Sequence, residues 1–246
     1  MPRDATPLAP TLVFLHEGLG SIAQWKDFPI QLCLATRMPG LAYDRWGFGR
    51  SEPLDRERSI EYLNHEAEIS LPAVLEQCQI DNPILIGHSD GGSIALIFAA
   101  AYPTRPRAIV TEAAHVFVEQ VTLDGIRAAV NVYESTNLRD RLARYHGDNT
   151  ERMFRGWSDI WLSPSFHDWN IEHLLPKITC PSLIMQGEDD EYGTDAQVDS
   201  IVRQVSGPAM RLMIPGCAHI PHHQARDRVL DEISRFATSL PDGRVP

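Results

Sequence analysis

A serine with a glycine two residues away on each side stands at the end of an apolar run. Residues 84–92 read ILIGHSDGG, which places Ser89 between Gly87 and Gly91. Where a strand meets a helix, this G-x-S-x-G pattern turns the backbone so sharply that side chains at the glycine positions would collide, and the hydroxyl projects above the sheet. We interpret Ser89 as a nucleophile. The alternative is an ordinary turn in which Ser89 or Asp90 is only a helix N-cap.

A serine hydroxyl is a weak nucleophile unless a base accepts its proton and a third group orients that base. Two acids, Asp189 and Asp190, follow an apolar run at 181–187, and His219 follows the last apolar run at 210–216. Serine, acid and histidine in this chain order are expected of a triad built on a G-x-S-x-G turn. All three positions lie beyond C-terminal strand ends, where the sites of open α/β sheets are found.

The elements that must position these residues follow an α/β pattern of short apolar runs alternating with longer helical segments. The apolar runs lack the alternation of a strand with one wet face, so we predict a parallel sheet that is buried on both sides. The predicted strands are 11–16, 41–44, 83–88, 108–113, 181–187 and 210–216. The predicted helical segments between them are 22–37, 59–79, 91–102, 195–206 and 222–239.

One long segment, 114–177, contains no strand pattern and separates the fourth strand from the fifth. It is far longer than the usual connection of about 2–6 residues. We predict a helical cap with helices at 121–134, 138–145 and 150–161, inserted into a core domain formed by 1–113 and 178–246. Most of its aromatic residues are expected to pack the cap onto the sheet, while Trp157 and Trp161 are expected to line a substrate pocket. His115, at the mouth of the cap, either contacts substrate or packs.

Composition excludes several classes of function. The chain has 246 residues, of which 43% are hydrophobic, and this suits one globular domain. Its net charge of −11 disfavours nucleic acid as a partner, because phosphates are neutralised by clustered Lys and Arg. The four cysteines are far apart and form no C-x-x-C pair. No signal peptide or membrane span is apparent, so we expect a cytoplasmic protein with no membrane partner.

Five motifs carry a family resemblance. They are LHEGLGS at 15–21, YDRWGFGRS at 43–51, GHSDGG at 87–92, GEDD at 187–190 and PGCAHIP at 215–221. Together they resemble the α/β-hydrolase superfamily over nearly the whole chain, and they look most like a branch of small carboxylic-ester hydrolases. The family begins with an antiparallel hairpin, whereas only ten residues precede Thr11. We therefore expect a truncated N-terminus and an α/β-hydrolase fold of about six mostly parallel strands flanked by helices.

The resemblance implies site roles. It makes Ser89 the nucleophile, selects Asp190 over Asp189 as the acid, and selects His219 over the two histidines at 222 and 223 as the base. It also implies that the backbone amides of Gly18 and Asp90 stabilise the oxyanion that forms during acyl transfer.

The chain departs from the family at Glu17, which stands where relatives usually have glycine after the histidine. The loop could therefore be wider, with the oxyanion donor shifted by one residue. The Glu17 side chain either faces the pocket and favours a cationic substrate, or is exposed or salt-bridged, which we favour. The Asp90 side chain either meets a substrate amine or complements the positive end of its helix, which we also favour. Asp44 and Arg45 resemble a family pair that braces the site without catalysing.

No metal or other cofactor is expected. His219, His222 and His223 lie close together, but no H-E-x-x-H or other recognisable ligand set accompanies them. His16 and His88, beside the oxyanion loop and the nucleophile, are expected to be supporting hydrogen-bond partners rather than bases.

We therefore expect a serine hydrolase that cleaves carboxylic esters of small or medium acyl groups through an acyl-enzyme. The same residues would serve a lactonase, an acyltransferase or a hydrolase of carbon–carbon bonds in ring-cleavage products. The alternative from another class is a non-catalytic ligand-binding protein on the same fold, which usually loses part of the triad. Residues 41–43 should form an edge strand, where pairing is possible, so a monomer and a homodimer are both compatible with the sequence.

Overall fold

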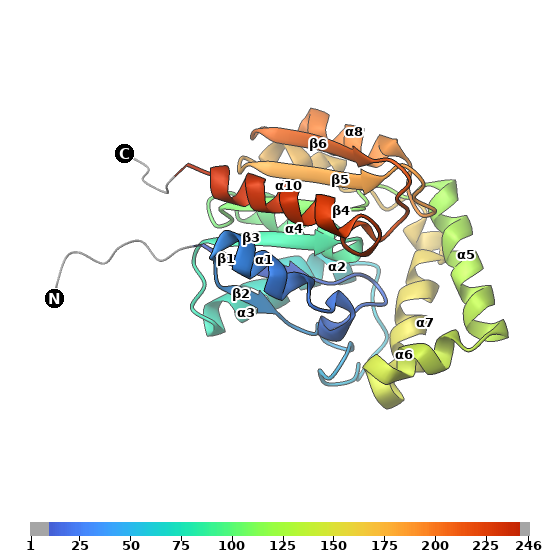
Figure 1. Ribbon diagram of the computed structural model, residues 1–246. Helices are drawn as coiled ribbons and strands as arrows, with labels where there is room; N and C mark the ends of the chain where they lie inside the picture. The colour runs from blue at the N-terminus through green and yellow to red at the C-terminus, as the bar shows by residue number, and fades with distance from the viewer. Residues whose placement is uncertain (1–9, 242–246) are drawn as a thin grey trace.

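The fold is built around one six-stranded parallel sheet (Figure 1). The computed structural model of the protein describes residues 10–241. The strand order is β2-β1-β3-β4-β5-β6, and every neighbouring pair is parallel. The strands are β1 (Thr11–Leu15), β2 (Gly40–Ala42), β3 (Pro83–His88), β4 (Ala108–Glu112), β5 (Ser182–Gly187) and β6 (Ala209–Ile214). The prediction of about six strands, mostly parallel, is confirmed, with β2 at one edge.

Burial explains why the strands could be read as continuous apolar runs. All six residues of β3, all five of β4 and all six of β5 are buried, because helices cover both faces of the sheet. The edge strands β2 and β6 are only partly covered. Chain order reverses at β1, which has β2 on one side and β3 on the other. The carboxyl ends of the central strands therefore face a common crevice, where ligands bind in open α/β sheets.

Two helical layers sandwich the sheet. In front of it in Figure 1 lie α1 (Phe28–Thr36) and α10 (Arg226–Ser239), which pack against each other. The other face is covered by α3 (Leu71–Gln77), α4 (Asp90–Ala101) and α8 (Asp195–Gln204). Nearly every residue of α4 is buried, since this helix has the sheet on one side and other helices on the other. Its apolar composition on all sides fits that position.

Short elements complete the core domain. They are η1 (Ile22–Trp25), α2 (Tyr62–His65), η2 (Glu66–Ser70), η5 (Glu172–Lys177) and α9 (Pro221–Gln224). The predicted helix 22–37 divides into η1 and α1 because Pro29 stands in the first turn of α1 and fixes a new helix start there. The predicted helix 59–79 begins at Tyr62 and carries a π-helical turn, η2, between two α-helical parts. Among the described residues, no helix is long and apolar enough to span a membrane.

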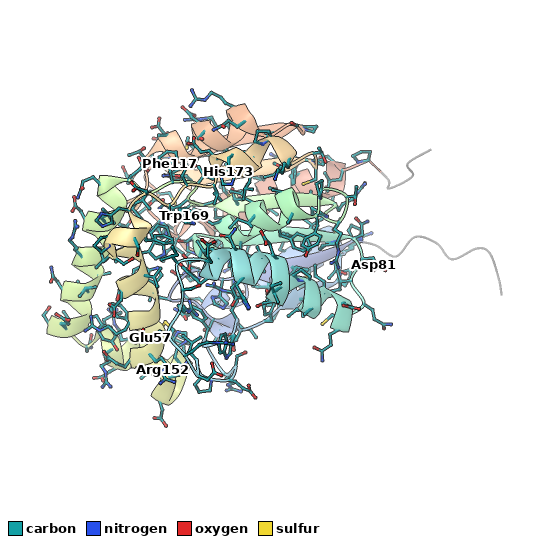
Figure 2. All side chains as sticks on the ribbon, turned by 180° about the vertical axis from the view of Figure 1, so that it is seen from behind. Glu57, Asp81, Phe117, Arg152, Trp169 and His173 are labelled. Carbon is teal, nitrogen blue, oxygen red and sulfur yellow. The ribbon has the colours of Figure 1, made fainter. Side chains whose placement is uncertain are left out.

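The helices inserted after β4 stand beside the carboxyl ends of the strands (Figure 1). They are α5 (Gln120–Ser135), α6 (Leu138–His146) and α7 (Thr150–Trp161). A short helix, η3 (Gly147–Asn149), joins α6 to α7, and another, η4 (Pro164–Phe166), follows α7. The chain enters and leaves this region side by side: Phe117 forms an antiparallel bridge with Asn170, and the Val118 amide donates to the Trp169 carbonyl at 3.3 Å. Figure 2 shows Phe117 and Trp169 together at this junction.

One face of α7 fastens these helices to the core. Its buried side chains include Met153, Phe154, Trp157 and Trp161. Met153 and Phe154 lie four and three residues before Trp157, and Trp161 lies four residues after it, so they share one face. Phe154 stacks on Tyr133 of α5 with a ring-centre distance of 3.7 Å. Most aromatic side chains of the region therefore serve packing, as the sequence indicated.

Candidate active site

Ser89 occupies a strained turn between β3 and α4. Its backbone has φ 51° and ψ −116°, a conformation that L-residues rarely adopt. A Cβ at Gly87 would collide with the carbonyl of Gly91, and a Cβ at Gly91 would collide with the carbonyl of Leu15. The Ser89 amide donates to the Glu112 carbonyl of β4 at 2.8 Å, which ties the turn to the next strand. The two glycines thus give the turn the room that it needs.

Ser89, His219 and Asp190 form a continuous hydrogen-bonded chain. The Ser89 Oγ lies 3.0 Å from His219 Nε2. On the far side of the ring, His219 Nδ1 lies 2.9 Å from Asp190 Oδ1 and 3.1 Å from Oδ2. With Nδ1 protonated and donating to the carboxylate, Nε2 is left as the acceptor for the serine proton. The side chains of His219 and Asp190 are only 8% and 1% exposed.

Asp190 and His219 come from the loops after β5 and β6, so the parallel sheet brings them to the same edge as Ser89. The Tyr192 amide donates to Asp190 Oδ1 at 2.8 Å and fixes the carboxylate. The His219 carbonyl lies 2.7 Å from His88 Nε2, which anchors the histidine loop next to the nucleophile turn. His88 therefore has the supporting role that the sequence suggested.

The charge on the triad depends on its burial. Burial by itself lowers the pKa of His219, but the Asp190 carboxylate and its hydrogen bond, together with Glu17 and Glu191, outweigh this and leave the pKa above its ordinary value of 6.5. For Asp190, burial opposes ionisation, yet the His219 partner and the Tyr192 amide leave its pKa below the ordinary value. Each partner thus favours the charged form of the other.

The two backbone amides expected to bind an oxyanion make no hydrogen bond of their own. Within residues 10–241, neither the Gly18 amide nor the Asp90 amide, which begins α4, donates to any other group, and both residues line the same cavity as Ser89. Gly18 sits directly under the indole of Trp157, where a Cβ would collide with the ring. His16, two residues earlier, is buried and its Nδ1 lies 2.8 Å from the Glu17 carbonyl. Burial, with help from the nearby Arg45, lowers the pKa of His16 well below its usual value, so the ring stays neutral.

A cavity of about 210 Å³ opens above Ser89, between the core and the inserted helices. Residues from the oxyanion loop, the nucleophile turn, α5, α7 and the two triad loops surround it. Its lining comprises Glu17, Gly18, Leu19, Gln24, Ser89, Asp90, His115, Thr122, Ile126, Leu142, Trp157, Trp161, Glu191, Tyr192, His219 and Ile220. Every pocket residue singled out in the sequence, namely Glu17, His115, Trp157 and Trp161, lies in this lining.

Sequence reasoning missed several of the lining residues. Thr122 and Ile126 stand one turn apart on α5, and they could have been found only once the orientation of that helix was known. Glu191 and Tyr192 follow Asp190 directly, so their place after a strand end was a readable signal.

A larger hollow of about 700 Å³ lies between residues 54–58 and α7, near the labelled Glu57 and Arg152 in Figure 2, and no triad residue lines it.

Carboxylates dominate the charge of the cavity. Its acidic lining residues are Glu17, Asp90 and Glu191, while His115, His219 and Tyr192 are the other ionisable groups and no Lys or Arg lines it. Glu17 lines the cavity with intermediate exposure and is in none of the described ion pairs, so it is not salt-bridged, and its contact with substrate stays a prediction. Burial raises the pKa of Glu17, and the nearby Asp90 acts in the same direction.

Asp90 has partners other than those expected. Its Oδ2 accepts a hydrogen bond from the Tyr62 hydroxyl at 2.8 Å and lies 3.8 Å from Arg45 Nη2. The predicted pairing of Arg45 with Asp44 is therefore wrong. Asp44 instead accepts from the backbone amides of Ile22 and Arg50, at 2.7 and 2.9 Å, and so joins its own loop to the start of η1. Arg45 is turned inward, toward the nucleophile.

The remaining histidines near the site are held by other groups. His222 Nδ1 lies 2.9 Å from Glu112 Oε2, and the two form a buried pair behind the triad. His115 Nε2 lies 3.0 Å from the Tyr192 carbonyl, while its Nδ1 has no partner among the described residues. Burial lowers the pKa of His115, so it lines the cavity as a neutral ring.

Comparison with known proteins identifies the family. Residues 12–232 match the model of the "Alpha/beta hydrolase family". The human protein "Serine hydrolase BPHL" is 31% identical over 202 residues, which cover 80% of this chain and 67% of the relative. A "2-hydroxy-6-oxononadienedioate/2-hydroxy-6-oxononatrienedioate hydrolase" from Cupriavidus pinatubonensis is 25% identical over 218 residues, which cover 77% of this chain and 74% of the relative.

Among solved structures, the 2-hydroxy-6-oxo-6-phenylhexa-2,4-dienoate hydrolase of Rhodococcus sp. strain RHA1 superposes with a TM-score of 0.79 at 15% identity. The match covers 92% of this chain and 90% of that one, and at this identity it establishes the shared fold. Since the family match spans nearly the whole sequence, the chain belongs to the alpha/beta hydrolase family.

Proposed function

We propose that the protein is a serine hydrolase that cleaves carboxylic esters of small acyl groups through a Ser89 acyl-enzyme. The observation that carries this proposal is the chain of contacts from Ser89 Oγ to His219 Nε2, at 3.0 Å, and from His219 Nδ1 to Asp190, at 2.9 Å. A nucleophile in contact with its base, and a base in contact with its orienting group, is the arrangement that activates a serine.

In the first half-reaction, Ser89 Oγ attacks the ester carbonyl carbon and passes its proton to His219 Nε2. Asp190 holds the tautomer of the ring and stabilises the imidazolium. The amides of Gly18 and Asp90 donate to the oxyanion, and one such donor is worth about 3–4 kcal/mol of transition-state stabilisation. The tetrahedral intermediate collapses when His219 returns the proton to the leaving alcohol, and the acyl group stays on Ser89.

In the second half-reaction, His219 takes a proton from water as the water oxygen attacks the acyl carbon. The bond from that carbon to Ser89 Oγ then breaks, His219 returns the proton to Ser89 Oγ, and the acid is released. An ester suits this site better than an amide does, because an amine leaves less easily and has to be protonated as it leaves. The size of the cavity limits the acyl group. A volume of about 210 Å³ lies below the 300–1,000 Å³ of pockets for drug-sized ligands.

The charge of the cavity favours neutral or cationic substrates. Glu17 and Glu191 line it without a balancing Lys or Arg, so a substrate carboxylate would meet like charges in a poorly hydrated space. This weighs against the reaction of the dienedioate hydrolase relative, whose named substrate is a dianion. A lactonase using the same triad is the second candidate, since a neutral lactone meets no such repulsion. A non-catalytic ligand-binding role is disfavoured, because all three triad residues are present and in contact.

We also propose that residues 114–177 act as a cap that sets substrate choice, on a core formed by 1–113 and 178–246. The support is that α5 and α7 contribute Thr122, Ile126, Trp157 and Trp161 to the cavity wall, while Ser89, Asp190 and His219 all come from the core. The partner implied is a small-molecule ester.

The test combines covalent labelling with turnover. Wild type and Ser89→Ala are treated with a fluorophosphonate probe and assayed against p-nitrophenyl esters from acetate to octanoate. We expect labelling at Ser89 in wild type alone, with turnover that declines as the acyl chain outgrows the cavity. If wild type is not labelled and hydrolyses no ester faster than Ser89→Ala does, the proposed function is wrong.

A further inference from the structure

Arg45 is a buried charge that the reaction described above does not use. It lies in the loop after β2, and its side chain is 0% exposed. Removing a guanidinium from water is costly unless it is paired. Yet the ion-pair distance to Asp90 is 3.8 Å, and Arg45 Nε and Nη1 have no hydrogen-bond partner among the described residues. Apart from stacking on the Phe48 ring, the close contacts of this charge are the hydrogen bonds of Nη2.

Those contacts go to the loop that carries one oxyanion donor. Arg45 Nη2 donates to the His16 carbonyl at 3.1 Å and to the Glu17 carbonyl at 2.7 Å. The Glu17 carbonyl and the Gly18 amide belong to the same peptide group. Because a trans peptide is planar, its C=O and N–H point in opposite directions, and fixing the oxygen fixes the direction of the N–H. By holding the Glu17 carbonyl, Arg45 thus fixes the direction of the Gly18 N–H on the opposite side of the peptide group.

The Glu17 carbonyl is surrounded by donors. Besides Arg45 Nη2, it accepts from the Gly20 amide at 3.2 Å, and His16 Nδ1 lies 2.8 Å away. His16 can donate from Nδ1 because its Nε2 accepts from the Arg45 amide at 3.1 Å. Donors at a carbonyl oxygen polarise the peptide and strengthen its N–H as a donor, and a charged donor does so most. This cluster therefore aims and strengthens the Gly18 amide.

Arg45 Nη2 also lies near the residue that carries the second oxyanion donor, Asp90. The Asp90 amide stands beside Ser89, and the Asp90 carboxylate lies between Arg45 Nη2, at 3.8 Å, and the Tyr62 hydroxyl, at 2.8 Å. The guanidinium itself is held over the Phe48 ring at 4.5 Å. One charged group therefore contacts both of the segments whose amides face the substrate carbonyl.

We propose that Arg45 is a positioning residue that sets the two oxyanion donors, Gly18 and Asp90, at the distance and angle required by the tetrahedral intermediate. This rests on the proposed function of Ser89. Arg45 contacts neither Ser89 nor the cavity, so its loss should leave substrate binding nearly unchanged and weaken stabilisation of the transition state. Removing one oxyanion donor costs about 10²–10³ in kcat, and a misaimed pair should cost a comparable factor of about 10².

The test compares Arg45→Met and Arg45→Lys with wild type on the best p-nitrophenyl ester, and all rates are divided by the fraction of protein that a fluorophosphonate titrates. For Arg45→Met we expect kcat to fall about 10²-fold while KM changes by less than about threefold. Arg45→Lys keeps the charge but loses the guanidinium geometry, so its kcat should be intermediate. Adding methylguanidinium to Arg45→Ala should restore part of kcat, and methylammonium should restore less.

Arg58→Met is the matched control. Arg58 is also an inward-facing arginine, stacked on the same Phe48 ring at 4.4 Å, but it donates to the Trp46 carbonyl and not to the oxyanion loop. Its loss should change stability without the selective fall in kcat.

Three results separate a failure of this inference from a failure of the proposed function. If wild type reacts with the probe and Arg45→Met keeps its kcat per titrated site within about threefold, Arg45 is only structural and this inference is wrong, even if the variant unfolds more easily. The inference is equally wrong if kcat and KM change alike in Arg45→Met and Arg58→Met. If wild type neither reacts nor turns over esters, the proposed function fails and this inference fails with it.

Discussion

Asp190 reaches the His219 ring with both of its carboxylate oxygens, at 2.9 and 3.1 Å from Nδ1, whereas its neighbour Asp189 is exposed. The first prediction follows from this contact. Asp190→Asn should lower kcat by about 10³–10⁴, because an amide can hold the wrong tautomer of the ring. Asp189→Asn, the matched control, should stay within about threefold of wild type, since an exposed charge contributes little. Equal losses in steady-state kinetics would contradict the assignment of Asp190.

The second prediction concerns pH. The base must be neutral to accept the Ser89 proton, so activity is lost as pH falls through the pKa of His219. Burial lowers that pKa, but Asp190, Glu17 and Glu191 together raise it above 6.5. The acid limb of kcat/KM should therefore have its midpoint above 6.5 in wild type.

Glu17→Gln provides the directional check on this pH profile. It removes a negative charge that stabilises the imidazolium, so the midpoint should move to lower pH. Glu188→Gln, at an exposed side chain outside the cavity lining, should leave the midpoint where it is. A midpoint that moves upward in Glu17→Gln, or equally in both variants, would contradict the electrostatic account.

The third prediction concerns substrate charge. Three p-nitrophenyl esters of matched length are compared: 3-aminopropanoate, butanoate and hemisuccinate, with Ser89→Ala as the blank for spontaneous hydrolysis. The ammonium ester should exceed the carboxylate ester in kcat/KM by about tenfold or more, which corresponds to about 1.4 kcal/mol. The variant Glu17→Gln/Glu191→Gln should lose most of this preference while retaining activity on butanoate. A preference for hemisuccinate would overturn the charge argument.

The fourth prediction concerns the contact between the inserted helices and the nucleophile helix. Trp161 Nε1 donates to the Tyr62 hydroxyl at 2.8 Å, and that hydroxyl donates to Asp90 Oδ2 at 2.8 Å. Tyr62→Phe would leave a buried carboxylate and a buried indole N–H without this partner, which should lower the free energy of unfolding by about 1–3 kcal/mol.

Tyr102→Phe is the control for this prediction. The Tyr102 hydroxyl also donates a single hydrogen bond, at 2.9 Å to the Glu68 carbonyl, but at an exposed position where water can replace it. Urea unfolding should show a loss of less than about 0.5 kcal/mol. If both variants lose the same free energy of unfolding, the buried hydrogen bonds from Trp161 to Tyr62 and from Tyr62 to Asp90 stabilise the fold no more than the exposed one does.

Much of the fold could be predicted from sequence because its signals are local. The strand predicted at 83–88 has the same bounds in the structure. A strand that is buried on both faces is a short apolar run bounded by turn residues, and such a run can be recognised in the sequence. The turn at Ser89 was also readable, because two glycines at fixed spacing mark a backbone that only they can form. The choice of Asp190 over Asp189, by contrast, came from family resemblance, and the His219 contacts supply its geometric basis.

The errors lie where side chains meet across the fold. Arg45 pairs with Asp90, 45 residues away, and not with the adjacent Asp44. No local sequence pattern shows whether the side chain of a loop arginine points into the core or toward solvent. For Glu17 the sequence left both a pocket-facing and an exposed or salt-bridged side chain open and favoured the latter, because carboxylates usually lie at the surface, yet Glu17 lines the cavity. The break between η1 and α1 had a readable signal in Pro29, whereas the π-helical turn of η2 had none.

The hydrogen bond between Trp161 and Tyr62 has a consequence for chimaeric enzymes. Transplanting the α5–α7 segment of a relative onto this core would exchange the pocket walls, and it would also delete the only indole that reaches Tyr62 among the described residues. Unless the donor segment brings an N–H group to the same point, the buried Tyr62 oxygen keeps its hydrogen bond to Asp90 but loses the donor that it accepts from. The match between inserted helices and core thus includes one hydrogen bond, from Trp161 Nε1 to Tyr62.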